Sequence, residues 1–199
     1  MKMTYSEQIL QIAYDNNGVV STAQVREAGI SREYLRLLVK KGLLERSERG
    51  VYIIPTFFDD EMFNLQMRFK RGILSHETAL FLLDLSDRTP SLFSMTFPLS
   101  YNTTKLKLEN VKYYRVKNDL YNLGVINGKT PGGNPIRLYN AERTLCDILK
   151  GRSNTEIQII TDAFKRYAGR NNKDIPLLSK YSKLFRVEKK VRTYLEVLL

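Results

Sequence analysis

The chain has 199 residues, enough to bury one sizeable hydrophobic core or two modest ones. With 43% hydrophobic and 27% charged residues, its composition excludes an intrinsically disordered chain and is that of a folded globular protein. The formal net charge of +11 indicates a polyanionic partner, which could be DNA, RNA, an acidic protein or an anionic membrane surface.

The N-terminal sequence MKMTYSEQIL lacks the apolar core of a signal peptide, and no segment approaches the roughly 20 apolar residues of a membrane span. A single cysteine, Cys146, cannot form an internal disulfide, which is typical of a reducing compartment. We therefore expect a cytoplasmic protein that does not have a membrane as its partner.

Two helices are predicted at the start of the chain, each introduced by a capping box. Thr4 with Glu7 three residues later precedes an apolar stripe, and an Asn-Asn-Gly segment ends this first helix. Ser21 and Gln24 repeat the pattern, and Gly29 ends a second, shorter helix.

A third helix and a hairpin follow. Ser31 is the expected N-cap of the helix, Gly42 its end, and its buried stripe consists of Leu35, Leu38 and Val39. Leu43-Leu44 and residues 51–54 then predict two strands, joined by a charged turn over residues 45–50. Helix, helix, turn, helix and hairpin is the order of a winged helix-turn-helix.

The pattern breaks near residues 56–60, which predicts a winged helix-turn-helix domain over residues 1–58 and an α+β domain over residues 59–199. A connecting helix opens the second domain. Strands are expected over residues 73–74, 92–99, 112–117, 124–127 and 135–139, and helices over residues 76–83, 141–149, 155–168, 175–181 and 183–198. A mixed sheet followed by a helical C-terminal tail makes the second domain, and the whole fold class, α+β.

Two of these elements have a specific pattern. The strand over residues 92–99 alternates, which predicts one buried face formed by Phe93, Met95, Phe97 and Leu99. The helix after Asn140 has that residue as its predicted N-cap and Glu142 in its first turn, where the helix dipole favours an acid.

The predicted third helix carries a basic face. Arg32, Arg36 and Lys40 lie four residues apart, so they share the side opposite the leucine stripe. Arginine can bind guanine O6 and N7 in a bidentate way, and other cations can contact phosphates. The predicted DNA-binding residues are Ser31, Arg32, Tyr34, Arg36 and Lys40, with Arg46 and Arg49 at the tip of the wing. The alternatives are a solvated face and a protein-docking module.

The last 49 residues are the most basic part of the chain, with a net charge of +6 against +2 for residues 1–55 and +3 for residues 56–150. The final helix has an apolar stripe of Leu184, Val187, Val191, Leu195 and Leu198. The basic residues beside it predict a surface for an acidic partner or the DNA backbone, formed by Arg186, Lys189, Lys190 and Arg192. The alternative is a packing helix with a solvated basic face.

No enzyme signature is present, so we predict no catalytic residue, no metal ligand and no cofactor. The GVINGKT segment at residues 124–130 has one residue too few for a phosphate-binding loop, and Pro131 follows it directly, so a turn is expected. His76 is the only histidine, which excludes a metal site built on several histidines. Cys146 has no partner histidine nearby and is expected in the core.

The chain resembles the AbiEi-type antitoxins, which are transcriptional regulators of abortive-infection, type IV toxin–antitoxin systems. The resemblance covers nearly the whole chain. It rests on the predicted winged helix and on three segments: SHETALFLLDLSDRTP at residues 75–90, LFSMTFP at residues 92–98 and NAERTLCDILKGRSN at residues 140–154.

This resemblance implies a repressor that binds inverted repeats in its own promoter, and a C-terminal domain that counteracts a nucleotidyltransferase-like toxin and assists cooperative DNA binding. It further implies that neutralisation does not require a stable complex with the toxin. Arg143 and Asp147, four residues apart, suit either a functional surface or a structural ion pair, and we favour the pair. Two other functions stay open: an RNA- or protein-binding adaptor with a basic C-terminal surface, and an enzyme acting on nucleotides.

Overall fold

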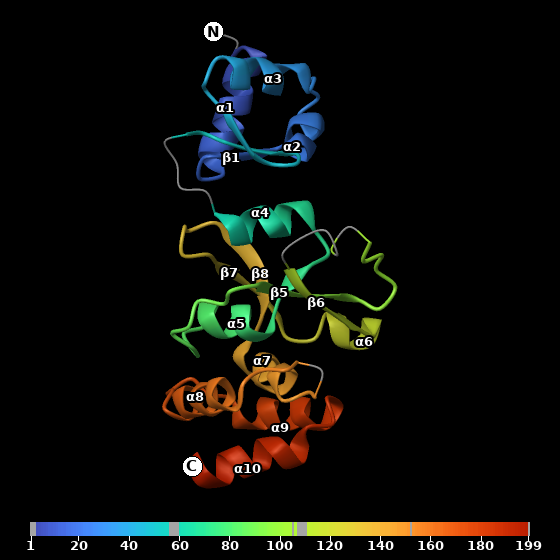
Figure 1. The fold of residues 1–199 in the computed structure, drawn as a ribbon, viewed down its shortest axis with the longest axis vertical. Coiled ribbons are helices and arrows are strands. Elements are labelled where there is room, and N and C mark those ends of the chain that lie inside the picture. Colours follow the sequence, from blue (N-terminus) through green and yellow to red (C-terminus); the bar gives the residue numbers. More distant parts are fainter. Residues whose placement is uncertain (1–2, 56–59, 105, 107–110, 152, 199) are drawn as a thin grey trace. The chain divides into compact units, whose positions relative to one another are not determined.

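The computed structural model describes residues 3–55, 60–104, 106, 111–151 and 153–198 (Figure 1). The chain divides into two compact units. Unit 1 comprises Met1–Lys70 together with Lys129–Pro135, and unit 2 comprises Arg71–Gly128 and Ile136–Leu199. The domain boundary predicted after residue 58 lies outside the described residues.

Unit 1 begins with two helices that have capping boxes, as predicted. In front of α1 (Tyr5–Asp15), the Glu7 carboxylate accepts the Thr4 N–H at 2.7 Å, and Thr4 Oγ1 accepts the Glu7 N–H. In front of α2 (Thr22–Glu27), Ser21 and Gln24 make the same reciprocal bonds at 2.8 and 3.2 Å. Each box satisfies two backbone donors that a helix N-terminus leaves free.

The third helix, α3 (Glu33–Lys40), starts one residue later than a Ser31 N-cap requires. Arg32 occupies the N-cap position with helical backbone angles and no capping side-chain bond. Ser31 Oγ still accepts the N–H of Glu33 at 3.4 Å, so it caps the preceding turn rather than the helix. The helix ends before Gly42, whose φ of +70° lies in the left-handed region that favours glycine.

The core of unit 1 lies between the helices and the sheet. Leu35 and Leu38 are fully buried, as predicted, but Val39 is 36% exposed. One residue along a helix rotates the side chain by about 100°, which carries Val39 away from the Leu38 side. The buried cluster consists of Ile9, Ala13, Val20, Val25, Ile30, Leu35, Leu38, Leu44 and Ile54.

The wing is a three-stranded antiparallel sheet, which completes the predicted winged helix-turn-helix. Its order is β1 (Val19–Ser21), β3 (Val51–Ile53), β2 (Glu45–Glu48). The predicted hairpin was displaced: its first strand is the charged segment, not the leucine pair, and Arg49 and Gly50 alone form the turn. An edge strand such as β2 tolerates charged side chains because one side of it faces water.

A buried carboxylate holds together two distant segments of unit 1. Asp60 caps α4 (Glu61–Arg68), the predicted connecting helix, by accepting the Phe63 N–H at 3.0 Å. Its other oxygen accepts the Asn134 amide at 3.0 Å and the Thr130 hydroxyl. Gly132 permits this approach, because a Cβ there would lie 2.8 Å from Asp60 Oδ2.

The sheet of unit 2 is mixed, as predicted. Its order is β6 (Val111–Val116), β5 (Phe93–Pro98), β4 (Ile73–Leu74), β8 (Pro135–Tyr139), β7 (Val125–Lys129). β5 runs parallel to β6 and antiparallel to β4, and β4 runs parallel to β8.

One prediction about these strands was wrong. β5 is buried along almost all of its length rather than on one face, because it is an internal strand, and Leu99 beyond its end is 53% exposed. The strand predicted over residues 124–127 is confirmed as β7, which runs on to Lys129, so the turn expected in the GVINGKT segment lies after it, at residues 131–132. The connection from Thr130 leads to β8 and not to a helix, so it lacks the geometry of a phosphate-binding loop.

Six helices of unit 2 are described: α5 (His76–Leu82), α6 (Asn118–Tyr121), α7 (Ala141–Ile148), α8 (Ile157–Ala168), α9 (Ile175–Leu184) and α10 (Glu188–Leu198). Asn140 caps α7 by accepting the Arg143 N–H at 3.0 Å, as predicted. α8 and α9 pack beside α7, and α10 packs against α8 and α9 (Figure 1). None of the helices in the described part of the chain is long and apolar enough to span a membrane.

The largest core of unit 2 joins α5 to these four C-terminal helices. It consists of Leu80, Leu85, Leu145, Cys146, Ile148, Leu149, Ile160, Ala163, Phe164, Tyr167, Leu178, Tyr181, Phe185, Val187 and Val191. Burial raises the pKa of the Cys146 thiol to about 12, so the side chain is a neutral core residue, as predicted.

Candidate nucleic-acid interface

The basic side chains of α3 lie on its exposed side. Arg32, Arg36 and Lys40 are all exposed, opposite the buried leucines. Arg36 pairs with Glu33 at 3.1 Å, and the two side chains are 80% and 74% exposed. A pair in this setting is worth at most about 1 kcal/mol, so Arg36 can exchange it for a base or phosphate at little cost.

Two of the other predicted residues at this helix have partly structural roles. Tyr34 is half-buried, and its ring lies against that of Tyr5 with the centroids 5.3 Å apart. Ser31 is exposed, but its hydroxyl oxygen is engaged by the N–H of Glu33. Tyr34 therefore fixes the start of α3 against α1.

The wing presents one basic residue at its tip rather than the predicted two. Arg49 is exposed in the turn between β2 and β3. Arg46 lies within β2, opposite Tyr52, and its Nε donates to the carbonyl of Glu48 at 3.3 Å. The turn between β2 and β3 consists of only two residues, Arg49 and Gly50, so Arg46 lies within the paired part of β2.

Exposed leucines border this basic surface, and sequence reasoning missed them. Leu37 and Leu43 are 44% and 45% exposed, and Leu37 directly follows Arg36. Leu37 falls outside the spacing of the buried stripe, which is the signal that could have identified it. An apolar side chain at this position can contact a thymine methyl group or a partner protein.

The C-terminal basic residues do not form one face. Lys189 and Arg192 are exposed on α10, with Arg192 at 3.8 Å from Glu188. Lys190 donates to the carbonyl of Leu149 at 2.8 Å, which ties α10 to the end of α7. Arg186 lies in the connection before α10.

The last helix is also shorter than predicted. α9 runs to Leu184, so this leucine belongs to α9 and is 48% exposed, whereas Val187 and Val191 are buried as expected. The chain turns over residues 185–187, between the buried Phe185 and Val187. The predicted apolar stripe is thus divided between two helices.

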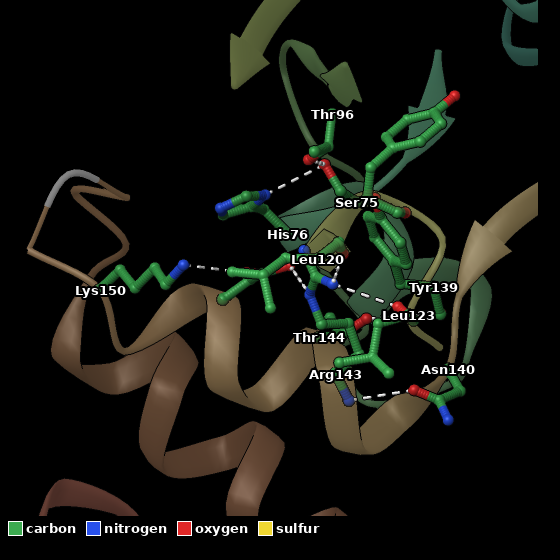
Figure 2. A network of polar contacts seen from close by, with 12 residues as sticks. Ser75, His76, Thr96, Leu120, Leu123, Tyr139, Asn140, Arg143, Thr144 and Lys150 are labelled. Carbon is green, nitrogen blue, oxygen red and sulfur yellow. Dashed lines mark hydrogen bonds and ion pairs between the residues drawn. The ribbon is translucent and has the colours of Figure 1, made fainter. Parts of the chain in front are cut away.

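Unit 2 contains a buried arginine within the NAERTLCD segment (Figure 2). Arg143 Nε donates to Asp147 Oδ2 at 2.8 Å, and its Nη1 donates to the carbonyls of Leu120 and Leu123 at 2.5 and 3.1 Å. Its guanidinium also lies 4.2 and 4.0 Å from the ring centroids of Tyr139 and Phe185. The predicted ion pair is present, and its burial makes it a core interaction.

A second polar cluster lies at the start of α5 (Figure 2). Ser75 Oγ accepts the hydroxyl of Thr96 at 2.9 Å and lies 3.0 Å from Nδ1 of His76. The His76 ring stacks on Tyr114 with the centroids 3.5 Å apart, and burial lowers the pKa of His76 to about 4. Since Ser75 is fully buried, the cluster organises the fold and does not offer a nucleophile.

Over the described residues, no group of three or more His, Cys, Asp or Glu side chains could hold a metal ion. The exposed cations of α3 and the wing are the arrangement best suited to a nucleic acid, because they are available to phosphates and base edges.

Two of three comparisons with known proteins found a similarity. Residues 7–55 match the family described as "Transcriptional regulator, AbiEi antitoxin". The crystal structure of RV2827C protein from Mycobacterium tuberculosis has a TM-score of 0.59 at 15% identity, covering 92% of this chain and 72% of that chain. At this identity the similarity shows the fold alone. No curated protein is significantly similar in sequence. The match over residues 7–55 supports the resemblance to AbiEi-type antitoxins for this region of the chain.

Proposed function

We propose that the protein is a DNA-binding transcriptional autorepressor and the antitoxin of a bacterial type IV toxin–antitoxin system that acts in abortive phage infection. The observation that carries this proposal is the exposed Arg32, Arg36 and Lys40 face of α3, within a winged helix whose residues 7–55 match the antitoxin family. An exposed basic helix opposite a buried apolar stripe is what insertion into the major groove requires.

In this proposal α3 enters the major groove with its N-terminal half closest to the bases. Arg32 and Arg36 contact base edges, and Arg36 leaves its exposed pair with Glu33 when it does so. Lys40 contacts phosphates from the other end of the helix, and Arg49 does so from the wing. Phosphate contacts fix the register, and the arginine contacts supply the sequence preference.

Inverted repeats in the promoter imply two copies of the winged helix, related by a twofold axis. Recognition helices of such pairs reach half-sites about 34–36 Å apart, one turn of B-DNA, or multiples of that distance. In the proposal, unit 2 assists cooperative binding and counteracts a nucleotidyltransferase-like toxin without a stable complex. Lys189 and Arg192 are its most available cations on α10.

The first experiment is a titration of the protein into a duplex from immediately upstream of its own gene, and into a scrambled duplex of equal length, at about 150 mM salt. The expected result is tighter binding to the native duplex, with an affinity that falls steeply as salt rises. Equal and weak binding to both duplexes would contradict sequence recognition by α3.

A second candidate function, a protein-binding adaptor, is favoured by one observation. Leu37 and Leu43 are large apolar side chains that are 44% and 45% exposed beside the basic face. A docking surface commonly combines an apolar centre with a charged rim. Substituting both leucines by serine separates the two functions: the adaptor loses its partner, whereas a DNA reader retains its salt-dependent affinity.

A further inference from the structure

Unit 2 holds a cavity of about 860 Å³ beside the edge strand β6. The rest of its described lining comes from His76 at the start of α5, Leu99 after β5, Asp147 of α7, Lys150, Gly151 and Ser153 after α7, and Arg186 after α9. Small-molecule sites in proteins usually have volumes of about 300–1,000 Å³. The cavity is therefore large enough for a ligand of the size of a nucleotide.

Four cationic side chains line this cavity: Lys112, Arg115, Lys150 and Arg186. Among the described lining residues the one carboxylate is Asp147, which Arg143 already neutralises at 2.8 Å. The lining thus has an excess of positive charge, which favours an anionic ligand.

The four cations differ in how firmly they are held. Lys112 pairs with Glu77 at 3.5 Å, and Lys150 lies 4.0 Å from Asp147. Arg115 and Arg186 are exposed, and neither forms an ion pair with a described carboxylate. These two guanidinium groups are therefore free to make bidentate contacts, the geometry that suits a phosphate.

The backbone at Arg186 gives a second, independent indication. Its N–H donates to the carbonyl of Lys183 at 3.1 Å, and the Val187 N–H donates to the carbonyl of Ser182 at 2.8 Å. These are the paired backbone bonds of a Schellman motif at the end of α9. Arg186 thus occupies the left-handed position, with φ of +58°, where glycine is strongly preferred. The corresponding positions after α2 and α3 are glycines, Gly29 and Gly42.

His76, across the cavity lining, also has a positive φ, of +51°. Strained backbone in non-glycine residues is concentrated at ligand sites and switches, where the surrounding structure holds it in place. Two such residues, Arg186 and His76, border this one cavity, although they come from segments far apart in the sequence.

The rest of the lining is aromatic and apolar. Tyr113 and Tyr114 of β6 line the cavity together with Leu99 and Val116, and Tyr114 is backed by the stacked ring of His76. The Tyr114 hydroxyl donates to the carbonyl of Ser153 at 3.2 Å, which fixes β6 to the α7–α8 connection. A cationic region beside an aromatic wall matches a ligand that has both a phosphate and a ring.

We propose that this cavity binds a phosphorylated small molecule with an aromatic portion, of the nucleoside diphosphate class. Arg115 and Arg186 hold the phosphates, Lys112 and Lys150 supply further positive charge, and the tyrosines of β6 contact the ring. This site is separate from the GVINGKT segment and goes beyond the proposed function, since it assigns a ligand to unit 2 that DNA recognition by α3 does not require.

Calorimetric titration of the full chain with ADP, pyrophosphate and adenosine, at constant ionic strength, tests the proposal. We expect saturable binding of one ADP per chain, with pyrophosphate weaker and adenosine weaker still. Arg115→Gln and Arg186→Gly should each lower the affinity for ADP by about tenfold or more, because each removes a charged hydrogen-bonding partner. Lys165→Gln, an exposed cation of α8 outside the cavity, is the matched control and should bind ADP as the wild type does.

Arg186→Gly separates binding from folding, because glycine is the preferred residue at this left-handed position. Its melting temperature should be equal to or above that of the wild type while ADP binding is lost. Absence of saturable binding of ADP and pyrophosphate would overturn the proposal, as would equal ADP affinity in the wild type and both variants.

A third arm uses a short DNA duplex of unrelated sequence. If ADP does not bind, and Arg115→Gln and Arg186→Gly lower the affinity for this duplex, the cavity belongs to a nucleic-acid surface and the proposal is wrong. The proposed function is tested separately by the native promoter duplex and α3 variants, so failure of the one does not imply failure of the other.

Discussion

Arg143 Nε lies 2.8 Å from Asp147 Oδ2 on α7, and the side chains of the two residues are 0% and 2% exposed. A buried pair gains little over a well-packed apolar pair, but removing one partner leaves the other as an uncompensated charge. Arg143 also ties α7 to the carbonyls of Leu120 and Leu123. The NAERTLCD segment is therefore a structural element of unit 2.

Arg143→Ala should lower the free energy of unfolding by about 3–5 kcal/mol, because it leaves the Asp147 charge buried without its partner. Urea denaturation of the full chain measures this. Arg88→Ala is the matched control: Arg88 pairs with Glu156 at 3.2 Å with both side chains largely exposed, and its loss should cost about 1 kcal/mol or less. If Arg143→Ala and Arg88→Ala lowered the free energy of unfolding by similar amounts, the structural role of the buried pair would be refuted.

Arg32→Ala and Arg36→Ala should each abolish the preference for the native promoter duplex, at a cost of about 1–3 kcal/mol in specific binding. Both side chains are exposed, so the folded state and melting temperature should not change. Competition binding between native and scrambled duplexes gives the readout, with Arg88→Ala again as the control. Unchanged specificity in both variants would mean that α3 is not the recognition helix.

The wing offers a comparison between two arginines. Arg49→Ala should weaken binding to all duplexes equally and reduce the slope of log affinity against log salt by about one, as loss of a phosphate contact requires. Arg46→Ala should have a smaller effect, because Arg46 lies in β2 and its Nε is bonded to the Glu48 carbonyl. A larger effect of Arg46→Ala would place the DNA along the strand instead of at the turn.

The C-terminal cations can be tested in cells that express the proposed toxin. Replacing Lys189, Lys190 and Arg192 together by alanine should reduce rescue from the toxin more than it reduces thermal stability. Lys190→Ala alone should cost about 1 kcal/mol of stability, since it removes the hydrogen bond to the Leu149 carbonyl. If the triple variant rescues cells fully, α10 serves only in packing.

The stability of unit 2 should depend on pH through His76. Because burial lowers its pKa to about 4, the folded state binds fewer protons than the unfolded state, in which the pKa is about 6.5. The stability that neutral His76 contributes to the free energy of unfolding is fully present above pH 6.5. It is lost as the pH falls toward 4, by up to about 3 kcal/mol. Lys112, Lys150, Arg143 and Asp147 are the charged groups that act on it.

His76→Asn provides the comparison, because asparagine tolerates a positive φ and does not titrate in this range. The difference in unfolding free energy between the wild type and this variant should shrink between pH 6.5 and 4.5. A difference that is constant over this range would show that His76 does not titrate as its burial requires.

Local chemistry made much of the fold predictable. The capping boxes of α1 and α2 and the Asn140 cap of α7 depend on residues three positions apart, so the sequence contains them fully. β1 was missed because it has only three residues, and β2 was misplaced because its residues are charged. What makes them strands is pairing with β3, which is a tertiary contact.

Burial was less predictable than the elements themselves. The spacing of Arg143 and Asp147 indicated their pairing, but their burial depends on Tyr139 and Phe185, which come from other elements. The cavity could not be predicted at all, since Lys112 and Arg186 lie far apart in the sequence and meet only in the folded unit. Periodicity describes one helix or strand, whereas a site depends on how several are brought together.

The hydrogen bonds of Asp60 limit which parts of the gene can be exchanged independently. The winged-helix unit is completed by residues 129–135, which are encoded well downstream of the rest of it. A gene rearrangement that exchanges only the first 70 codons would combine Asp60 of one parent with residues 130 and 134 of the other, and Asp60 would lose these two donors wherever those residues are not Thr and Asn. An exchange that keeps the Asp60 hydrogen bonds must therefore carry both segments, residues 1–70 and residues 129–135, from the same parent.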